Sequence, residues 1–312
     1  MGHFIFTLFI AAAQAAPAPA QQPLTLLGHS APVKAVAFSP DGSFLASAGS
    51  DSKVVLWTVK TGKVKKTLIG HKEPVWALAF SPEGDYLASS DNKLVEVWKI
   101  PGGKNFKTLT GQSHSLYSVA FSPGGEYLFS GGYDCVGIWT FPEGEVHRAM
   151  KSKVGTANFV AMLPAGNYAL SGNGGGTLTV WNINDGKITK TISAHKDGVK
   201  AAALSPDGAY VVSAGPEEEV KVWRLSDGAL VNSFAAHPNG ARAVAISPDG
   251  KRVATGGGDG AVRLWNLQGA QKKPVREFLD HEASVDALAF SPDSKTLASG
   301  SKDMAVKLWK LQ

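Results

Sequence analysis

The sequence predicts an all-β fold made of seven similar units, each formed by four short antiparallel strands. Seven of the eight tryptophans recur at intervals of 41 to 44 residues, namely Trp57, Trp98, Trp139, Trp181, Trp223, Trp265 and Trp309. A turn motif keeps the same interval, with SPDG at residues 39–42, 205–208 and 247–250 and related tetrapeptides at 81–84, 122–125, 163–166 and 291–294. Self-similarity at a fixed period of this length indicates a repeat protein, here covering residues 23–312.

The first unit shows the four expected strands most clearly. Apolar and β-branched runs occupy residues 33–38, 44–48, 53–58 and 63–68, and turn-forming residues separate them at 39–42, 50–52 and 61–62. Turn signals this close together favour an antiparallel sheet, and no segment of the repeats shows a helical period.

The composition is that of a chain with a large core and a mildly basic surface. Hydrophobic residues make up 44% and charged residues 18%, and the formal net charge is +5. Because no Lys/Arg-rich run is present, we expect no nucleic acid partner. The single cysteine, Cys135, excludes an intrachain disulfide framework and a multi-cysteine metal site.

The N-terminal residues differ from the repeats and predict export. Residues 4–13 form an apolar run, an A-x-A cleavage pattern follows at residues 13–15, and residues 16–22 form a Pro/Ala linker. We expect residues 1–15 to be a signal peptide and the protein to be periplasmic or extracellular. The run is too short to span a bilayer as a helix. Since no Lys or Arg precedes the run, a cytoplasmic location is the alternative.

A third marker makes a family resemblance explicit. A His follows a small or acidic residue at residues 28–29, 70–71, 194–195, 236–237 and 280–281. With the turn motif, an Asp before the third strand and the Trp, these markers make residues 23–312 resemble the WD-repeat family. The resemblance implies a seven-bladed β-propeller, with blades arranged radially around a central channel.

The ends of the repeat region predict how the ring closes. The last unit has only three strands before residue 312, whereas residues 23–27 (PLTLL) precede the first Gly-His pair and resemble a fourth strand elsewhere, residues 66–69 (KTLI). We therefore expect residues 23–27 to supply the outer strand of the seventh blade, which would leave no open seam.

Repeated His, Ser/Thr, Asp and Trp residues admit a hydrolytic or a structural interpretation. The resemblance implies that they form a buried hydrogen-bond relay between strands and loop, and recurrence in three units speaks against a single active site. The predicted relay residues are His29, Ser47, Asp51 and Trp57; His237, Thr255, Asp259 and Trp265; and His281, Ser299, Asp303 and Trp309.

The other units depart from this pattern. Asn92 is interpreted as replacing the Asp of the second unit, Gln112 as replacing the loop His of the third, and Glu217 as replacing the Asp of the fifth. The fourth unit has Ser152 and Lys153 in the loop and glycines at residues 174–176, so it is expected to be the least rigid.

The resemblance also implies a docking surface around the channel. Its residues, one per blade at the start of the innermost strand, are Lys34, Trp76, Tyr117, Asn158, Lys200, Arg242 and Asp286. Three residues that precede the turn Asp are expected to join them, namely Ser50, Gly132 and Lys302. Because aromatic and Arg side chains dominate binding hot spots, we expect a ligand segment with an acidic part and an apolar anchor.

Two classes of function follow from these patterns. The leading prediction is a non-catalytic scaffold that binds a protein or peptide through the channel face, as a monomeric ring within a larger complex. The alternative is an exported propeller with a small-molecule or enzymatic site at the channel mouth. No unrepeated acid/base pair, metal-ligand cluster or phosphate loop stands out, so no cofactor, metal or catalytic residue is expected.

Overall fold

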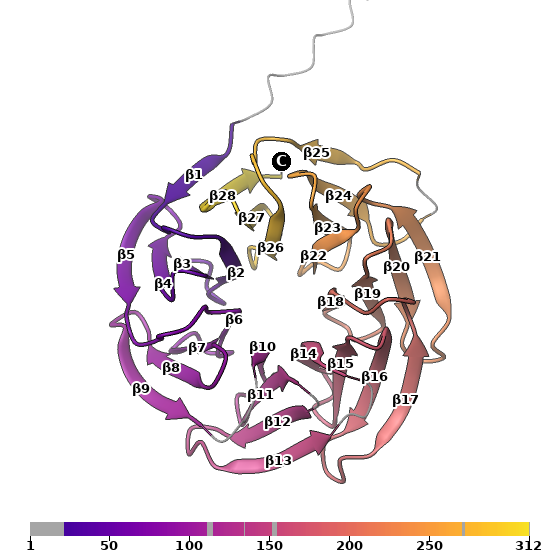
Figure 1. Ribbon diagram of the computed structural model, residues 1–312, viewed down its shortest axis with the longest axis horizontal. Coiled ribbons are helices and arrows are strands. Elements are labelled where there is room, and N and C mark those ends of the chain that lie inside the picture. Colours follow the sequence, from indigo (N-terminus) through magenta and orange to yellow (C-terminus); the bar gives the residue numbers. More distant parts are fainter. Residues whose placement is uncertain (1–21, 111–114, 134, 152–154, 270–271, 312) are drawn as a thin grey trace, which may run out of the picture.

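The fold is a closed ring of seven β-sheets (Figure 1). The computed structural model describes residues 22–110, 115–133, 135–151, 155–269 and 272–311. These residues form 28 strands arranged in seven four-stranded sheets, and none of them is helical. The predicted seven-bladed β-propeller with antiparallel four-stranded blades is therefore confirmed.

Within the first six blades the strands follow one another outward from the channel. Blades one to three consist of β2 (Val33–Phe38), β3 (Phe44–Gly49), β4 (Val54–Thr58) and β5 (Lys63–Leu68); β6 (Ala77–Phe80), β7 (Tyr86–Ser90), β8 (Val95–Lys99) and β9 (Lys104–Leu109); and β10 (Leu116–Phe121), β11 (Tyr127–Gly132), β12 (Cys135–Thr140) and β13 (Val146–Lys151).

The remaining blades repeat this order, except that the last takes its outer strand from the other end of the chain. They consist of β14 (Ala157–Met162), β15 (Tyr168–Asn173), β16 (Thr177–Asn182) and β17 (Ile188–Ser193); β18 (Ala201–Leu204), β19 (Tyr210–Ala214), β20 (Glu219–Arg224) and β21 (Leu230–Ala235); β22 (Ala241–Ile246), β23 (Arg252–Gly257), β24 (Val262–Asn266) and β25 (Arg276–Phe278); and β26 (Val285–Phe290), β27 (Thr296–Ser301), β28 (Ala305–Lys310) and β1 (Leu24–Leu27).

The turn between the first two strands of a blade explains the recurring tetrapeptides. Gly42 has a φ of 71°, a left-handed conformation that glycine adopts without steric cost, and its N–H donates to Ser39 O. In the seventh blade Ser294 takes the same place with a φ of 60° and donates to Ser291 O. The turn geometry is thus kept even where the glycine is not.

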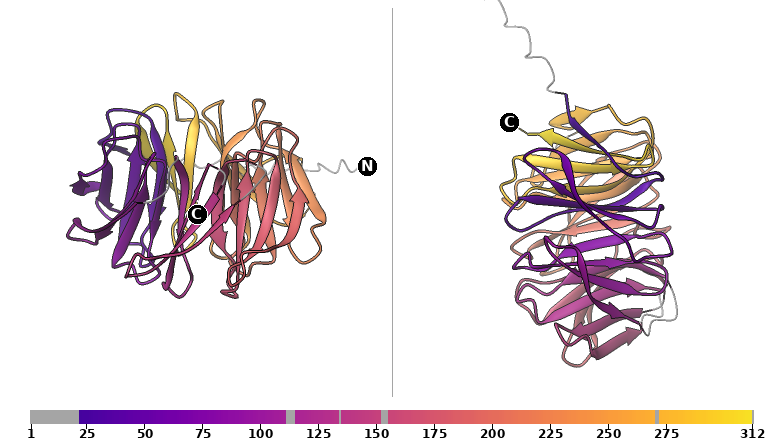
Figure 2. Two further views of the ribbon diagram at one scale, coloured as in Figure 1. Left: turned by 60° about the horizontal axis from the view of Figure 1, so that its bottom comes forward. Right: turned by 90° about the vertical axis from the view of Figure 1, so that its left-hand side faces the viewer.

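The core lies mainly between blades rather than within one. Trp57 of the first blade, 1% exposed, packs in one cluster with Ala298, Val306 and Leu308 of the seventh. Trp265 likewise packs with Val222 and Phe234 of the fifth blade. The periodic tryptophans therefore join neighbouring blades around the disc, which Figure 2 shows edge-on.

The ring closes where β1 and β28 lie side by side (Figure 1). They pair antiparallel, with Leu24 opposite Leu308 and Leu27 opposite Ala305. Leu26 is 2% exposed and joins the core cluster of Trp57. The prediction that the N-terminal segment completes the seventh blade is confirmed. Pairing with β1 satisfies the backbone groups along the outer edge of β28, which would otherwise be exposed.

Candidate functional site

The seven predicted docking residues stand at irregularities in the innermost strands. The pairing register shifts across Lys34, Tyr117, Asn158, Arg242 and Asp286, so each is the extra residue opposite the neighbouring strand. The other two, Trp76 and Lys200, directly precede β6 and β18 and donate their N–H groups to the second strand. Such bulges re-aim a side chain, here from the sheet face into the channel.

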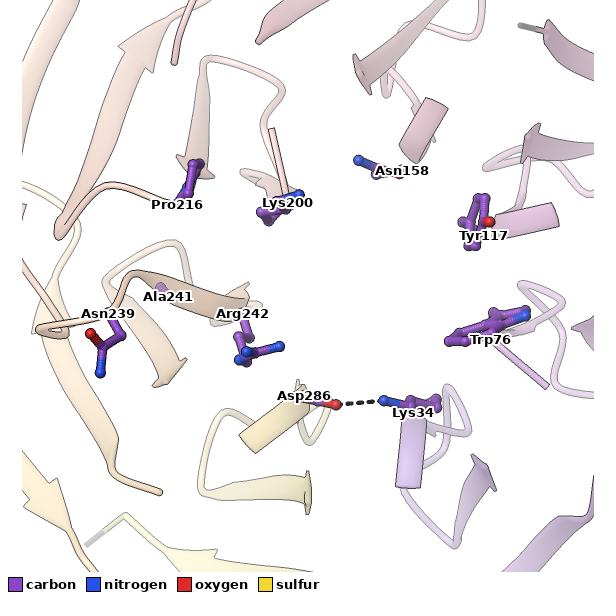
Figure 3. A pocket seen from close by; sticks show the side chains of 11 residues that line it. Lys34, Trp76, Tyr117, Asn158, Lys200, Pro216, Asn239, Ala241, Arg242 and Asp286 are labelled. Atoms are coloured by element: carbon purple, nitrogen blue, oxygen red, sulfur yellow. Dashed lines mark hydrogen bonds and ion pairs between the residues drawn. The ribbon is translucent and has the colours of Figure 1, made fainter. Parts of the chain in front are cut away.

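These seven side chains form a layer between a wide channel mouth and the narrower channel. A cavity of about 510 Å³ at the mouth is lined by all seven and by Gly215, Pro216, Asn239 and Ala241 (Figure 3). A second space of about 310 Å³ is lined by the same seven and by the residues that follow them in the inner strands. The seven residues that the family resemblance implied, one per blade, therefore line the same cavity.

One wall of the mouth is aromatic. The rings of Trp76 and Tyr117 lie 5.7 Å apart at an interplanar angle of 60°, and both residues are partly exposed. The indole Nε1–H of Trp76 donates to Asn92 Oδ1 at 2.9 Å, and Lys34 Nζ lies 5.8 Å from its ring centroid. The indole is thus held in place by its edge while one face remains available in the mouth.

The facing wall carries the free positive charge. Lys34 pairs with Asp286, with 2.7 Å between Nζ and Oδ2, so these two charges offset each other. Lys200 and Arg242 are exposed and form no ion pair or hydrogen bond through their side chains within the described residues. Figure 3 shows Lys200 and Arg242 on the side of the mouth opposite Trp76 and Tyr117. Of the three cationic residues that line the mouth, Lys200 and Arg242 are therefore the two without an ion pair within the described residues.

The remaining predicted positions take less part in the mouth. Asn158 donates its Nδ2–H to Val199 O at 2.8 Å and so bridges two neighbouring blades. Ser50, Gly132 and Lys302 do not line the cavity. Pro216 and Asn239 do line it, and they were missed because they lie in loops, one within the fifth blade and one between the fifth and sixth blades, where the spacing of the strands gives no signal.

The predicted relay residues contact one another. In the first blade Trp57 Nε1–H donates to Ser47 Oγ at 2.7 Å, Ser47 lies 2.7 Å from His29 Nε2, and His29 Nδ1 lies 3.1 Å from Asp51. The sixth and seventh blades repeat the arrangement, with the His–carboxylate contact at 2.8 and 2.6 Å. Each hydroxyl is occupied by a tryptophan and a histidine and is fully buried, which leaves no accessible nucleophile.

Two further blades contain the relay, and the structure corrects the sequence interpretation in the second blade but not in the fifth. In the second blade Asp91, not Asn92, contacts His71 Nδ1 at 2.7 Å, so the assignment of Asn92 was wrong. The shorter turn moves the carboxylate one position earlier, and Asn92 binds Trp76 instead. In the fifth blade Glu217 reaches His195 Nδ1 at 2.8 Å and replaces the usual Asp. Gln112, Ser152 and Lys153 lie outside the described residues.

Burial favours the neutral form of three relay histidines. It lowers the pKa of His195, His237 and His281 below the ordinary 6.5, and the neighbouring carboxylates Glu217, Asp259 and Asp303 only partly oppose it. A neutral ring can donate a hydrogen bond from Nδ1–H to the carboxylate and accept a hydrogen bond from the hydroxyl at Nε2. Burial raises the pKa of Asp303, but bonds from the N–H of Ala305 and from His281 outweigh it, so this carboxyl stays ionised.

The part of the chain that the structure describes contains no group of three or more His, Cys, Asp or Glu placed to hold a metal ion. Nor does it contain a helix with the length and apolarity needed to cross a membrane.

A closed ring of seven four-stranded blades, with Trp–Ser–His–carboxylate relays between strands and loops, defines a WD-type propeller. The chain belongs to the WD domain, G-beta repeat family, which matches residues 21–58, 62–99, 103–137, 186–224, 228–266 and 272–310. It is also similar to the Small ribosomal subunit protein RACK1 of Medicago sativa, at 54% identity over 39 residues. That match spans 12% of each chain. Family membership supports a protein-interaction scaffold.

Proposed function

We propose that the protein is a non-catalytic scaffold whose channel mouth binds a peptide segment with a carboxylate and an apolar anchor. The observation that carries this is one cavity of about 510 Å³ with Trp76 and Tyr117 on one wall and the unpaired Lys200 and Arg242 on the other. An apolar side chain on the aromatic wall would place a neighbouring acidic residue within reach of the cations.

The physical properties of the two walls support this ligand class. Trp76 is fixed by its bond to Asn92, so burying its free face against a ligand costs little side-chain entropy. The Arg242 guanidinium can bind a carboxylate through two parallel hydrogen bonds. Tryptophan and arginine are also the residues most enriched among binding hot spots.

A small-molecule site at the channel mouth is the second candidate. The cavity volume of about 510 Å³ lies within the usual size of ligand pockets, roughly 300 to 1,000 Å³. An acidic aromatic metabolite would use the same two walls. Selection of peptides and screening of metabolites on the same protein distinguish the two candidates.

The test is selection of a random peptide library on the wild-type protein, followed by binding assays with the variants. We expect selected peptides to combine Asp or Glu with a large apolar residue. The double variant Trp76→Ala, Arg242→Glu should weaken their binding by about 100-fold or more, which corresponds to two hot-spot contacts.

Lys302→Glu is the matched control, because it makes the same kind of charge reversal at an exposed residue outside the cavity. It should leave the affinity unchanged. Selected peptides that lack acidic residues, or that bind Lys200→Glu, Arg242→Glu as tightly as the wild type, would contradict the proposal. A protein partner can then be sought by capture with the wild type and the double variant.

The cellular compartment belongs to the same proposal. We propose that the ring acts after export, as part of a larger envelope assembly; this rests on residues 1–15, which lie outside the described residues. N-terminal sequencing of the protein from its native source tests it. A mature chain that begins after residue 15 would support export, and an intact Met1 in a cytosolic fraction would refute it.

A further inference from the structure

A second pocket lies at the opposite ends of the inner strands from the channel mouth, between the second and third blades. Its volume is about 250 Å³, and it is formed by the turns that follow β6 and β10 and by residues just after β12. Tyr86, Phe141 and Pro82 are among its walls, and we call it the aromatic pocket. It shares no residue with the channel mouth.

The aromatic side chains of this pocket belong to a cluster. The rings of Tyr86 and Phe141 lie 5.0 Å apart and nearly perpendicular, and Phe106 and Phe121 pack behind them at 4.9 and 5.1 Å. Phe141 donates its N–H to Glu126 O, just as Ile183 donates to Asn167 O in the next blade. An aromatic ring therefore stands where the equivalent position of the fourth blade has an aliphatic side chain.

Glu83, one of the acidic residues of the pocket, differs in its hydrogen bonding from the Asp at the same turn position of four other blades. In four blades the turn Asp accepts a hydrogen bond of 2.5 Å from the Ser hydroxyl of its own turn, as Asp41 does from Ser39. In the second blade Glu83 takes that place, and within the described residues it forms no such bond and no ion pair. The longer side chain thus leaves its carboxylate available.

Asp85 is the second carboxylate of the pocket. Its carbonyl oxygen accepts the N–H of Ile100, and the equivalent bonds of the third, sixth and seventh blades join Phe141 to Glu126, Leu267 to Lys251 and Leu311 to Lys295. The sixth and seventh blades thus carry a cation where the second carries an anion. Glu126, from the third blade, adds a third carboxylate to the pocket and accepts a bond from Ser122 Oγ.

We propose that the aromatic pocket binds an arginine side chain of a partner protein. Three exposed carboxylates surround aromatic walls, and none of them pairs with a cation within the described residues. The side chain of Lys99 lies over the ring of Phe106, 5.5 Å from its centroid, rather than in an ion pair. The negative charge of the pocket is therefore complementary to a cation of a binding partner.

Arginine fits this arrangement better than lysine. Its planar guanidinium stacks on an aromatic ring and at the same time presents a fork of N–H donors to carboxylates. A lysine ammonium is compact and strongly hydrated, so it gains less from the rings. The pocket is also smaller than typical small-molecule sites, which suits a single side chain.

The test uses three capped tripeptides, Gly-Arg-Gly, Gly-Lys-Gly and Gly-citrulline-Gly, titrated into the isotopically labelled full chain. The readout is the movement of the amide resonances of Gly124 and Gly125, which line the pocket. The arginine peptide should bind saturably with a millimolar dissociation constant, as expected for one side chain, and the neutral citrulline peptide should not bind. The lysine peptide should bind at least about threefold more weakly than the arginine peptide.

The double variant Glu83→Gln, Asp85→Asn should weaken binding of the arginine peptide by about fivefold or more, because it removes two of the three charges. Phe141→Ile, which introduces the aliphatic residue of the next blade, keeps the fold and should weaken binding by about threefold or more. The control Glu143→Gln, Glu145→Gln removes two exposed carboxylates of the third blade outside the pocket and should leave binding unchanged.

Three results would overturn the proposal. They are equal binding of the arginine and citrulline peptides, equal binding of the arginine and lysine peptides, and binding that survives the loss of both Glu83 and Asp85. Amide shifts confined to the channel mouth would also overturn it. Because the pocket and the mouth share no residue, failure of this proposal leaves that for the channel mouth intact.

Discussion

The fourth and fifth blades are neighbours with the same architecture, yet they attach their loops differently. In the fifth blade Ser213 accepts the indole N–H of Trp223 and contacts His195, both at 2.9 Å. In the fourth, Ser171 accepts the N–H of Trp181 at 2.8 Å, but no His occurs in residues 148–194. Asn173 instead holds the turn between β15 and β16 through Gly175 and Thr177.

The comparison separates a constant part of the blade from a variable one. The Trp–Ser bond, buried between strands, is present in both blades, whereas the connection from sheet to loop is present in only one. The family matches also leave out residues 138–185, which include most of the fourth blade. The sheet therefore does not depend on the relay in order to form, and the relay mainly fixes the loop that precedes each blade.

Opening the ring tests whether blades with relays are stable by themselves. Deletion of residues 23–27 removes Leu26 from the core and exposes the edge of β28. We expect a loss on the order of 3–5 kcal/mol in the free energy of unfolding and a fall in Tm of roughly 10 °C. Differential scanning calorimetry measures this, and Thr25→Ala, at an exposed position of the same strand, is the control.

An unchanged Tm after the deletion would mean that the seventh blade holds its relay without an outer strand. A fall in Tm with a separate early transition would instead show that the seventh blade opens alone. The expected single transition means that the interblade tryptophan contacts couple the whole ring.

Two serine substitutions sharpen the comparison at the level of single hydroxyls. Ser213→Ala leaves both Trp223 Nε1 and His195 Nε2 without a buried partner, while Ser171→Ala leaves only Trp181 Nε1. Since each orphaned polar group costs about 1–3 kcal/mol, we expect Ser213→Ala to cost about 2–4 kcal/mol and Ser171→Ala about half as much. Denaturant unfolding at pH 7 measures both. Equal losses would mean that the contact between Ser213 and His195 does not stabilise the fifth blade.

The sequence predicted the architecture because its signals are local and repeated. The turn motif, the Trp spacing and the segment 23–27 each specify a strand or a turn, and the seven sheets and the closing strand follow from them. The relay partner of His71 was misassigned, because one shorter turn moves Asp91 by a single position and spacing cannot show which carboxylate points at the ring.

Contacts between residues far apart in the chain could not be predicted from the sequence. The pairing of Lys34 with Asp286 joins residues 252 positions apart and changes which cations remain free in the mouth. The strand bulges that aim these side chains into the channel also leave no mark in the alternating pattern. The aromatic pocket was missed because Glu83 looks like an ordinary variant of the turn Asp until the hydrogen bonds of the other turns are compared.

The smallest expected effect is a dependence of stability on pH, to which three relay histidines contribute. The pKa of His195, His237 and His281 lies below 6.5 in the folded chain because of burial, whereas the unfolded chain binds protons near 6.5. Below that pH the unfolded state therefore takes up more protons, and the free energy of unfolding falls as the pH falls. Above it the three histidines make no contribution to the slope.

Melting curves between pH 8 and pH 5 measure this slope. His281→Gln removes one of the three groups, so its stability, although lower at pH 7, should fall less steeply below pH 6.5 than that of the wild type. Thr25→Ala, at an exposed position of β1, removes no titratable group and should keep the wild-type slope. An identical slope in His281→Gln would mean that burial does not hold the seventh-blade histidine neutral in the folded chain.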